Sequence, residues 1–66
     1  MEEAKRVAEA METAHVTQAE LAAVLGITQQ AVFQQLKRGL TREKADYWID
    51  IITGIAKRRY RAMEEF

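Results

Sequence analysis

Residues 17–37 read TQAELAAVLGITQQAVFQQLK, and this stretch decides the fold. Thr17 and Glu20 form a capping-box pattern just before an apolar run, which marks the start of a helix. Gly26 stands where a left-handed residue would end that helix, because glycine adopts this conformation without steric strain. Thr28 then provides an N-cap for the next helix. The stretch predicts two short helices joined by a tight turn, which is a helix-turn-helix.

The predicted helix-turn-helix covers residues 17–38, and its second helix ends at Gly39. Ala22 is expected where the two helices cross, since a larger side chain there would push them apart. Apolar side chains should fill the angle between the helices, namely Leu21, Leu25, Ile27 and Val32. This assignment leaves the other side chains of the second helix pointing outward.

The segments on either side also have helical patterns, and the chain contains no proline. In residues 2–14 the apolar side chains recur at spacings of three and four, which gives one apolar stripe. Thr41 is the expected N-cap of a last helix over residues 42–64, about 34 Å long at a rise of 1.5 Å per residue. We therefore expect an all-α fold in which residues 1–66 form one small helical bundle with a helix-turn-helix and a long C-terminal helix.

The long helix over residues 42–64 has an apolar arc of about 160°, wider than the ~100° that a single packing partner needs. The arc is either a wide core face around Trp48, with a break at Gly54, or a core face extended by a dimer seam. A chain of 66 residues without cysteine has no disulfide bonds and buries little apolar surface by itself, and such chains usually bury more by forming oligomers. We expect a homodimer, with a dimerisation seam made of Ile51, Ile55, Tyr60 and Met63.

The formal net charge is zero, which argues against a purely electrostatic coat for nucleic acid, but the charges are distributed unevenly. Residues 21–36 carry no charged side chain and include four glutamines. Residues 37–61 carry eight lysines and arginines against three acidic residues. An uncharged, glutamine-rich segment next to a basic one is unusual for a surface that only meets water.

The outward side chains of the second short helix suit the major groove of DNA. Glutamine can bind adenine through two hydrogen bonds, and an exposed phenylalanine can contact a thymine methyl group. We therefore predict a set of base-reading residues, namely Thr28, Gln29, Gln30, Phe33 and Gln34. The nearby cations are predicted to contact DNA phosphates, and these are Lys37, Arg38, Arg42 and Lys44.

Residues 18–37 resemble the helix-turn-helix of small phage and plasmid repressors, especially those of the Cro/CI type. The matching positions are Gln18, Ala22, Gly26, Gln29 and Val32. In that family the first glutamine binds the phosphate backbone of double-stranded DNA and braces the glutamine that opens the recognition helix. The resemblance implies these two roles for Gln18 and Gln29. It covers about twenty residues closely and about forty loosely.

One position departs from that family, which usually has an apolar residue nine positions after the turn glycine. This chain has Gln35 at that position and its apolar residue, Leu36, one place later. Residues 31–38 are also similar to plasmid repressors of the TrfB/KorA type, which tolerate the later spacing, and sigma-factor region-4-like modules share it.

The sequence lacks the residues and patterns that are typical of enzymes, metal-binding proteins and membrane proteins. An enzyme is not expected, because the sequence has no serine or cysteine nucleophile and no glycine-rich phosphate loop. The absence of cysteine and the single His15, a polar linker residue, leave no metal site, and no cofactor or small-molecule ligand is expected. No apolar run approaches the ~20 residues that span a bilayer, and no secretory signal pattern is present, so we expect a cytoplasmic protein with no membrane partner.

The sequence favours a DNA-binding transcriptional repressor that binds a palindromic operator as a homodimer. The alternative is a protein-interaction module, such as an antitoxin or a polymerase-binding adaptor, for which a charged recognition surface would be more typical. The basic run at residues 57–61 has two interpretations. It is either a solvated helix end that complements the helix dipole, or a clamp for DNA phosphates.

Overall fold

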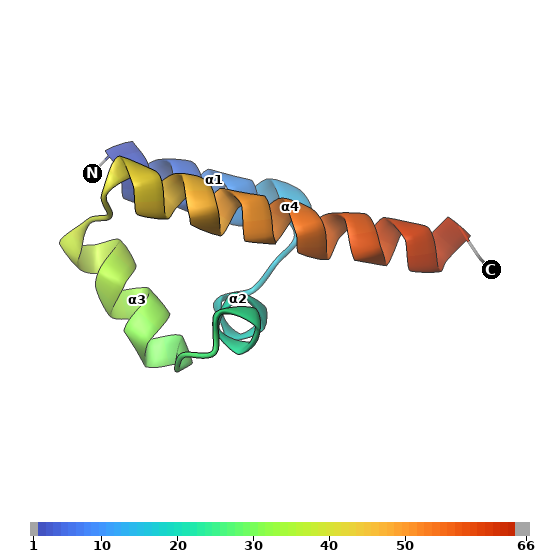
Figure 1. Cartoon of the computed structure of the whole chain (residues 1–66), viewed down its shortest axis with the longest axis horizontal. Helices are drawn as coiled ribbons and strands as arrows, with labels where there is room; N and C mark the ends of the chain where they lie inside the picture. The colour runs from blue at the N-terminus through green and yellow to red at the C-terminus, as the bar shows by residue number, and fades with distance from the viewer. Residues whose placement is uncertain (1, 65–66) are drawn as a thin grey trace.

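Four helices make up the computed structural model, which describes residues 2–64 (Figure 1). They are α1 (Glu2–Ala14), α2 (Gln18–Leu25), α3 (Gln29–Arg38) and α4 (Arg42–Glu64). α1 and α4 lie side by side and run in the same direction, and α2 and α3 lie together on one side of that pair (Figure 1). The predicted all-α bundle with a long last helix is confirmed.

The three later helices each begin at a threonine that accepts a backbone hydrogen bond. The hydroxyl of Thr17 accepts from the amide of Glu20 at 3.1 Å, and the carboxylate of Glu20 accepts from the amide of Thr17 at 3.1 Å, which completes the capping box. Thr28 and Thr41 accept equivalent amide bonds at 3.0 Å and 3.2 Å. Each such cap contributes about 1 kcal/mol, so the predicted helix starts are stabilised locally.

The turn between α2 and α3 depends on Gly26, whose φ of 74° and ψ of 27° place it in the left-handed region. The amide of Ile27 donates to the carbonyl of Ala22 at 3.1 Å and so closes the end of α2. Ile27 itself is 37% exposed, so the prediction that it fills the angle between α2 and α3 is wrong. It lies between the left-handed glycine and the extended N-cap Thr28, where the backbone is not helical and the helical period no longer places side chains inward.

The core lies where the α1–α4 pair meets the two short helices. Trp48 of α4 is 2% exposed and is the largest fully buried side chain, which confirms its predicted place in the core. α1 contributes Val7 and Met11, while α2 and α3 contribute Leu21, Ala22 and Val32. Leu25 and Leu36 are half-buried and pack against this core. The helix-turn-helix therefore packs against a hydrophobic core to which α1 and α4, the first and last helices, both contribute.

α4 is one continuous helix from Arg42 to Glu64, so the expected alternative of a break at Gly54 is not realised. Its last turns extend past the end of α1 (Figure 1). Within residues 2–64, none of the helices combines the length and the apolar character that crossing a membrane requires.

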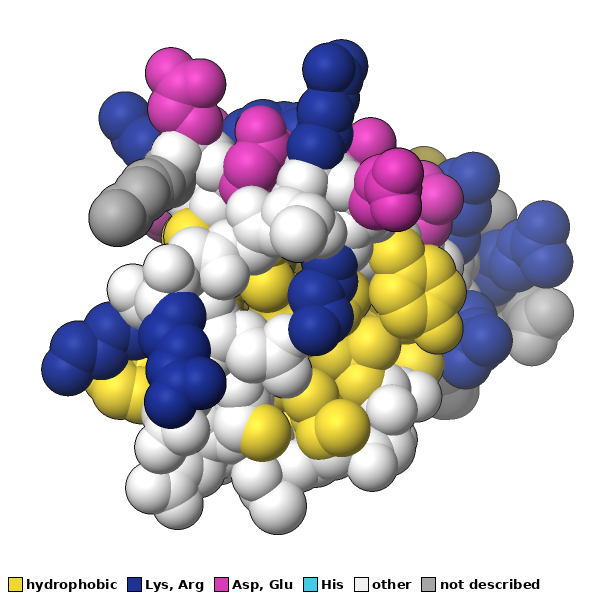
Figure 2. Space-filling model, turned by 60° about the vertical axis from the view of Figure 1, so that its left-hand side comes forward, with side chains coloured by type: hydrophobic (Ala, Val, Ile, Leu, Met, Phe, Trp, Pro, Cys, Tyr) yellow, Lys and Arg dark blue, Asp and Glu magenta, His cyan; other side chains and the backbone are white. Residues whose placement is uncertain are grey.

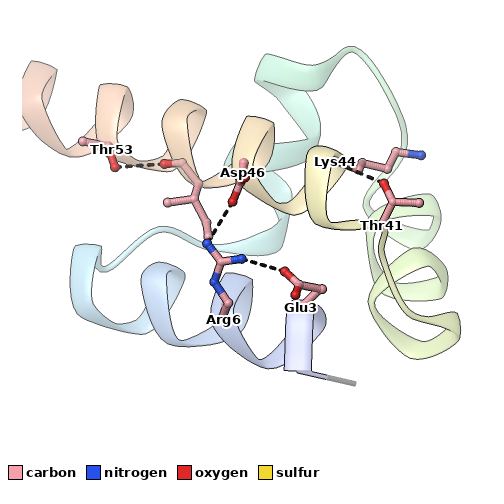
Figure 3. A network of polar contacts seen from close by, with 7 residues as sticks. Glu3, Arg6, Thr41, Lys44, Asp46 and Thr53 are labelled. Carbon is pink, nitrogen blue, oxygen red and sulfur yellow. Dashed lines mark hydrogen bonds and ion pairs between the residues drawn. The ribbon is translucent and has the colours of Figure 1, made fainter.

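Polar contacts also fasten α4 to α1 (Figure 3). The guanidinium of Arg6 donates to Glu3 at 2.6 Å within α1 and to Asp46 of α4 at 2.9 Å. The bonds to Asp46 and then to Glu3 raise the pKa of Arg6 above its ordinary value, since both favour the charged form. This exposed bridge links the two helices near their N-terminal ends.

Candidate nucleic-acid interface

The outward side of α3 carries the predicted base-reading residues, and all of them are exposed. Val32, on the opposite side of the helix, is 0% exposed, so the core fixes which side of α3 faces outward. Phe33 is 52% exposed although it is an aromatic residue. The exposed set on α3 and its N-cap is Thr28, Gln29, Gln30, Phe33 and Gln34.

The polar groups of this face are available to a ligand. Within residues 2–64, the amides of Gln29, Gln30 and Gln34 take part in no hydrogen bond with other side chains. Each amide offers both a donor and an acceptor, which is what the edge of an adenine requires. The hydroxyl of Thr28 accepts the amide bond that caps α3, and its own hydrogen remains free to be donated. The face can therefore form several hydrogen bonds without first breaking internal ones.

The predicted phosphate-binding cations lie where α3 ends and α4 begins. Lys37 and Arg38 form the last turn of α3, and Arg42 and Lys44 belong to the first turn of α4. All four are exposed, and none forms an ion pair in the part of the chain that the structure describes. The three-residue connection between the helices thus brings all four cations to one end of the recognition helix.

Acidic side chains are kept away from this face. Figure 2 views the molecule with α3 turned toward the reader, and the aspartates and glutamates in view gather along the upper part, over α1 and α4. The lower part, where α2 and α3 lie, shows only uncharged and basic side chains in this view (Figure 2). α3 itself carries no aspartate or glutamate, so a polyanion approaching its outward side would meet no repelling carboxylate on this helix.

Two glutamines behave differently from the exposed ones. Gln18 is the first residue of α2 and is half-buried, and within the described residues it forms no hydrogen bond with Gln29. Gln35 is half-buried against the body of the protein, and its Oε1 atom is buried without a hydrogen-bond partner among the described residues. Leu36, the next residue, packs against the core at its side. The departure from the resembled family thus places an amide where an apolar side chain would fit.

The four predicted seam residues of α4 do not share one face. Ile51 and Ile55 are half-buried beside the core, whereas Tyr60 and Met63 are 65% and 74% exposed on the part of α4 beyond α1. Nine residues separate Ile51 from Tyr60, and at about 100° per residue they lie on opposite sides of the helix. Only Ile51 and Ile55 are brought together by the structure.

The structure also gives Arg59 an internal role that the sequence pattern did not reveal. Its guanidinium donates to the backbone oxygen of His15 at 2.6 Å and forms an ion pair with Glu20 at the start of α2. His15 has a φ of 57°, unusual for a residue other than glycine, and forms the corner between α1 and α2. One arginine of the basic run thus holds the corner that leads into the helix-turn-helix.

The functional assignment of this protein rests on the geometry of residues 18–44 described above. Comparisons of the chain with protein-family models, with curated proteins and with solved structures gave no match.

Proposed function

We propose that this chain is a sequence-specific DNA-binding protein that represses transcription from a palindromic operator as a homodimer. The observation that carries the proposal is the exposed, uncharged reading face of α3, on which the side-chain amides of Gln29, Gln30 and Gln34 form no hydrogen bond with other residues of the described range 2–64. Glutamines on a recognition helix can bind adenine edges, and Phe33 can contact a thymine methyl.

The surrounding charges support the same function. Lys37, Arg38, Arg42 and Lys44 flank the reading face without internal ion pairs in the described residues, so each can neutralise a phosphate. Gln18 at the start of α2 would contact the phosphate backbone of the DNA on the other side of α3. Phosphate contacts of this kind orient the helix, while the glutamines supply the sequence preference.

A homodimer would recognise a longer DNA site than a single chain can. One recognition helix contacts only a few base pairs, so a symmetric pair would bind two half-sites about 34–36 Å apart. Such a pair predicts an operator with two-fold sequence symmetry. When the operator overlaps a promoter, the bound pair would exclude polymerase and lower transcription.

The test is a selection of binding sites from a randomised duplex library, followed by gel shifts over a range of salt concentrations. The expected result is an enriched palindrome for which the logarithm of the binding constant falls linearly with the logarithm of salt concentration. A reporter promoter carrying the enriched site should then lose activity when the protein is expressed.

The control is a pair of variants with opposite expected results. Replacing Gln29, Gln30 and Gln34 together by alanine should abolish enrichment, whereas Thr13→Ala on the exposed side of α1 should leave it unchanged. If no sequence is enriched at any salt concentration, the DNA-binding proposal is wrong. The glutamine and phenylalanine face would then be assigned to a protein partner.

A further inference from the structure

A shallow groove of about 230 Å³ lies between α2 and α4, on a side of α4 that no other helix covers completely. Its walls are largely apolar, since Val24 is 50% exposed and Ile51 and Ile55 are half-buried. Tyr47, one turn before Ile51, is 59% exposed. Figure 2 shows apolar surface open to solvent between α4 above and the helix-turn-helix below.

Gly54 forms part of this groove, and the single chain gives no reason for a glycine there. It stands in the interior of α4, where glycine destabilises a helix by about 1 kcal/mol relative to alanine. A Cβ atom added at Gly54 would meet nothing within 4 Å, and its backbone is not in the left-handed region. Close approach of another backbone is the remaining use of a glycine at such a position.

The residues around Gly54 are arranged symmetrically along α4. Positions 47, 50, 54, 58 and 61 are spaced by three, four, four and three residues, so they lie along one side of the helix. If two copies of α4 cross antiparallel at Gly54 on a two-fold axis, each position faces the partner's mirror position. Asp50 then faces the partner's Arg58, and Tyr47 faces the partner's Arg61.

The chemistry at these mirrored positions is complementary. Asp50 and Arg58 carry opposite charges, are exposed, and form no ion pair within residues 2–64. An arginine against a tyrosine ring gains a cation–π contact. Because the axis repeats every contact, one interface contains two ion pairs and two such stacked contacts.

We propose that a second copy of this chain occupies the groove, with the two α4 helices antiparallel and crossing at Gly54. This interface rests on the proposed function, because it specifies the surface through which the proposed homodimer forms. That surface consists of Val24 of α2 and these residues of α4: Tyr47, Asp50, Ile51, Gly54, Ile55, Arg58 and Arg61. Tyr60, on the other side of α4, lies outside it.

The test is sedimentation equilibrium of the full chain over a micromolar concentration series, without DNA. Asp50→Arg and Arg58→Glu should each weaken dimerisation by at least about tenfold, because each brings like charges together twice. The double variant Asp50→Arg/Arg58→Glu restores opposite charges and should return to within about threefold of the wild type. Glu12→Arg and Lys5→Glu change the net charge equally at exposed positions of α1 and should have no effect.

A second variant separates docking from folding. Gly54→Leu replaces glycine by a better helix former, so its helical content by circular dichroism should be kept or increased. The added side chain blocks the crossing point, and this variant should be monomeric at concentrations where the wild type is dimeric. A dimeric Gly54→Leu chain would overturn the proposed crossing.

Each of the other possible results also tests either the interface or the DNA-binding function. A wild type that stays monomeric throughout, single variants no weaker than their α1 controls, or a double variant that fails to recover would each overturn the interface. If the charge swap behaves as expected but no DNA sequence is selected, the interface stands and the DNA-binding function fails. If DNA is selected while the charge variants remain dimeric, the function stands and the interface lies elsewhere.

Discussion

Replacing Gln35 by leucine should stabilise this protein. Gln35 is half-buried and its Oε1 atom is buried with no hydrogen-bond partner among the described residues. An unpaired buried acceptor costs roughly 1–3 kcal/mol relative to its hydrated state. Leucine has a similar size and helix propensity and removes that acceptor, while it extends the apolar contact that Leu36 makes with the core.

The expected gain is about 1–2 kcal/mol, at the lower end of that range because Gln35 is only half-buried. For a domain of this size, each kcal/mol raises the melting temperature by about 4–8 °C. Thermal unfolding followed by circular dichroism at matched protein concentrations would measure the difference.

Gln34→Leu is the matched control, since it makes the same exchange one position away on the exposed side of α3. It should change stability by less than about 0.5 kcal/mol. If Gln35→Leu is no more stable than the wild type, or gains no more than Gln34→Leu, the buried oxygen does not destabilise the folded protein. DNA affinity should be unchanged in Gln35→Leu, because this side chain is not on the reading face.

Three further outcomes are expected. Gln30→Ala should lower affinity for the selected sequence by about 1–3 kcal/mol and relax preference at one base pair, with little change on random DNA, as measured by competition gel shifts. Lys37→Ala or Arg38→Ala should weaken binding to both kinds of DNA and reduce the salt slope by about one, and an unchanged slope for both would place these cations away from DNA. His15→Gly should be more stable than His15→Ala by about 1 kcal/mol in urea unfolding, because the φ of 57° disfavours alanine; equal stabilities would contradict this strain.

The helix starts and the turn could be predicted because their chemistry is local. Thr17, Thr28 and Thr41 each bind an amide three residues ahead, and Gly26 needs only its own backbone conformation. The apolar spacing likewise placed Trp48 in the core, since a helix repeats its inward side with a fixed period. These features depend on neighbours within a few residues of one another.

The features that were missed depend on contacts between distant residues or on breaks in the helical period. Arg59 binds the carbonyl of His15, 44 positions earlier, and nothing in the run of arginines distinguishes it from its neighbours. Ile27 was misplaced because the turn interrupts the period on which its assignment relied. The chemical character of the reading face followed from the sequence. The predicted seam was misplaced because nine positions at about 100° each put Ile51 and Tyr60 on opposite sides of α4.

The parallel pairing of α1 with α4 has a consequence for how the chain folds. Arg6 and Asp46 are 40 positions apart, so forming this pair closes a loop that contains the whole helix-turn-helix. Val7 from the first helix and Trp48 from the last belong to the same core as Leu21 and Val32 of the two short helices. During synthesis, residues 1–38 therefore emerge without their core, and folding should begin only when α4 has left the ribosome. Loop closure over most of the chain should also make folding slower than in a bundle of sequential antiparallel helices of the same length.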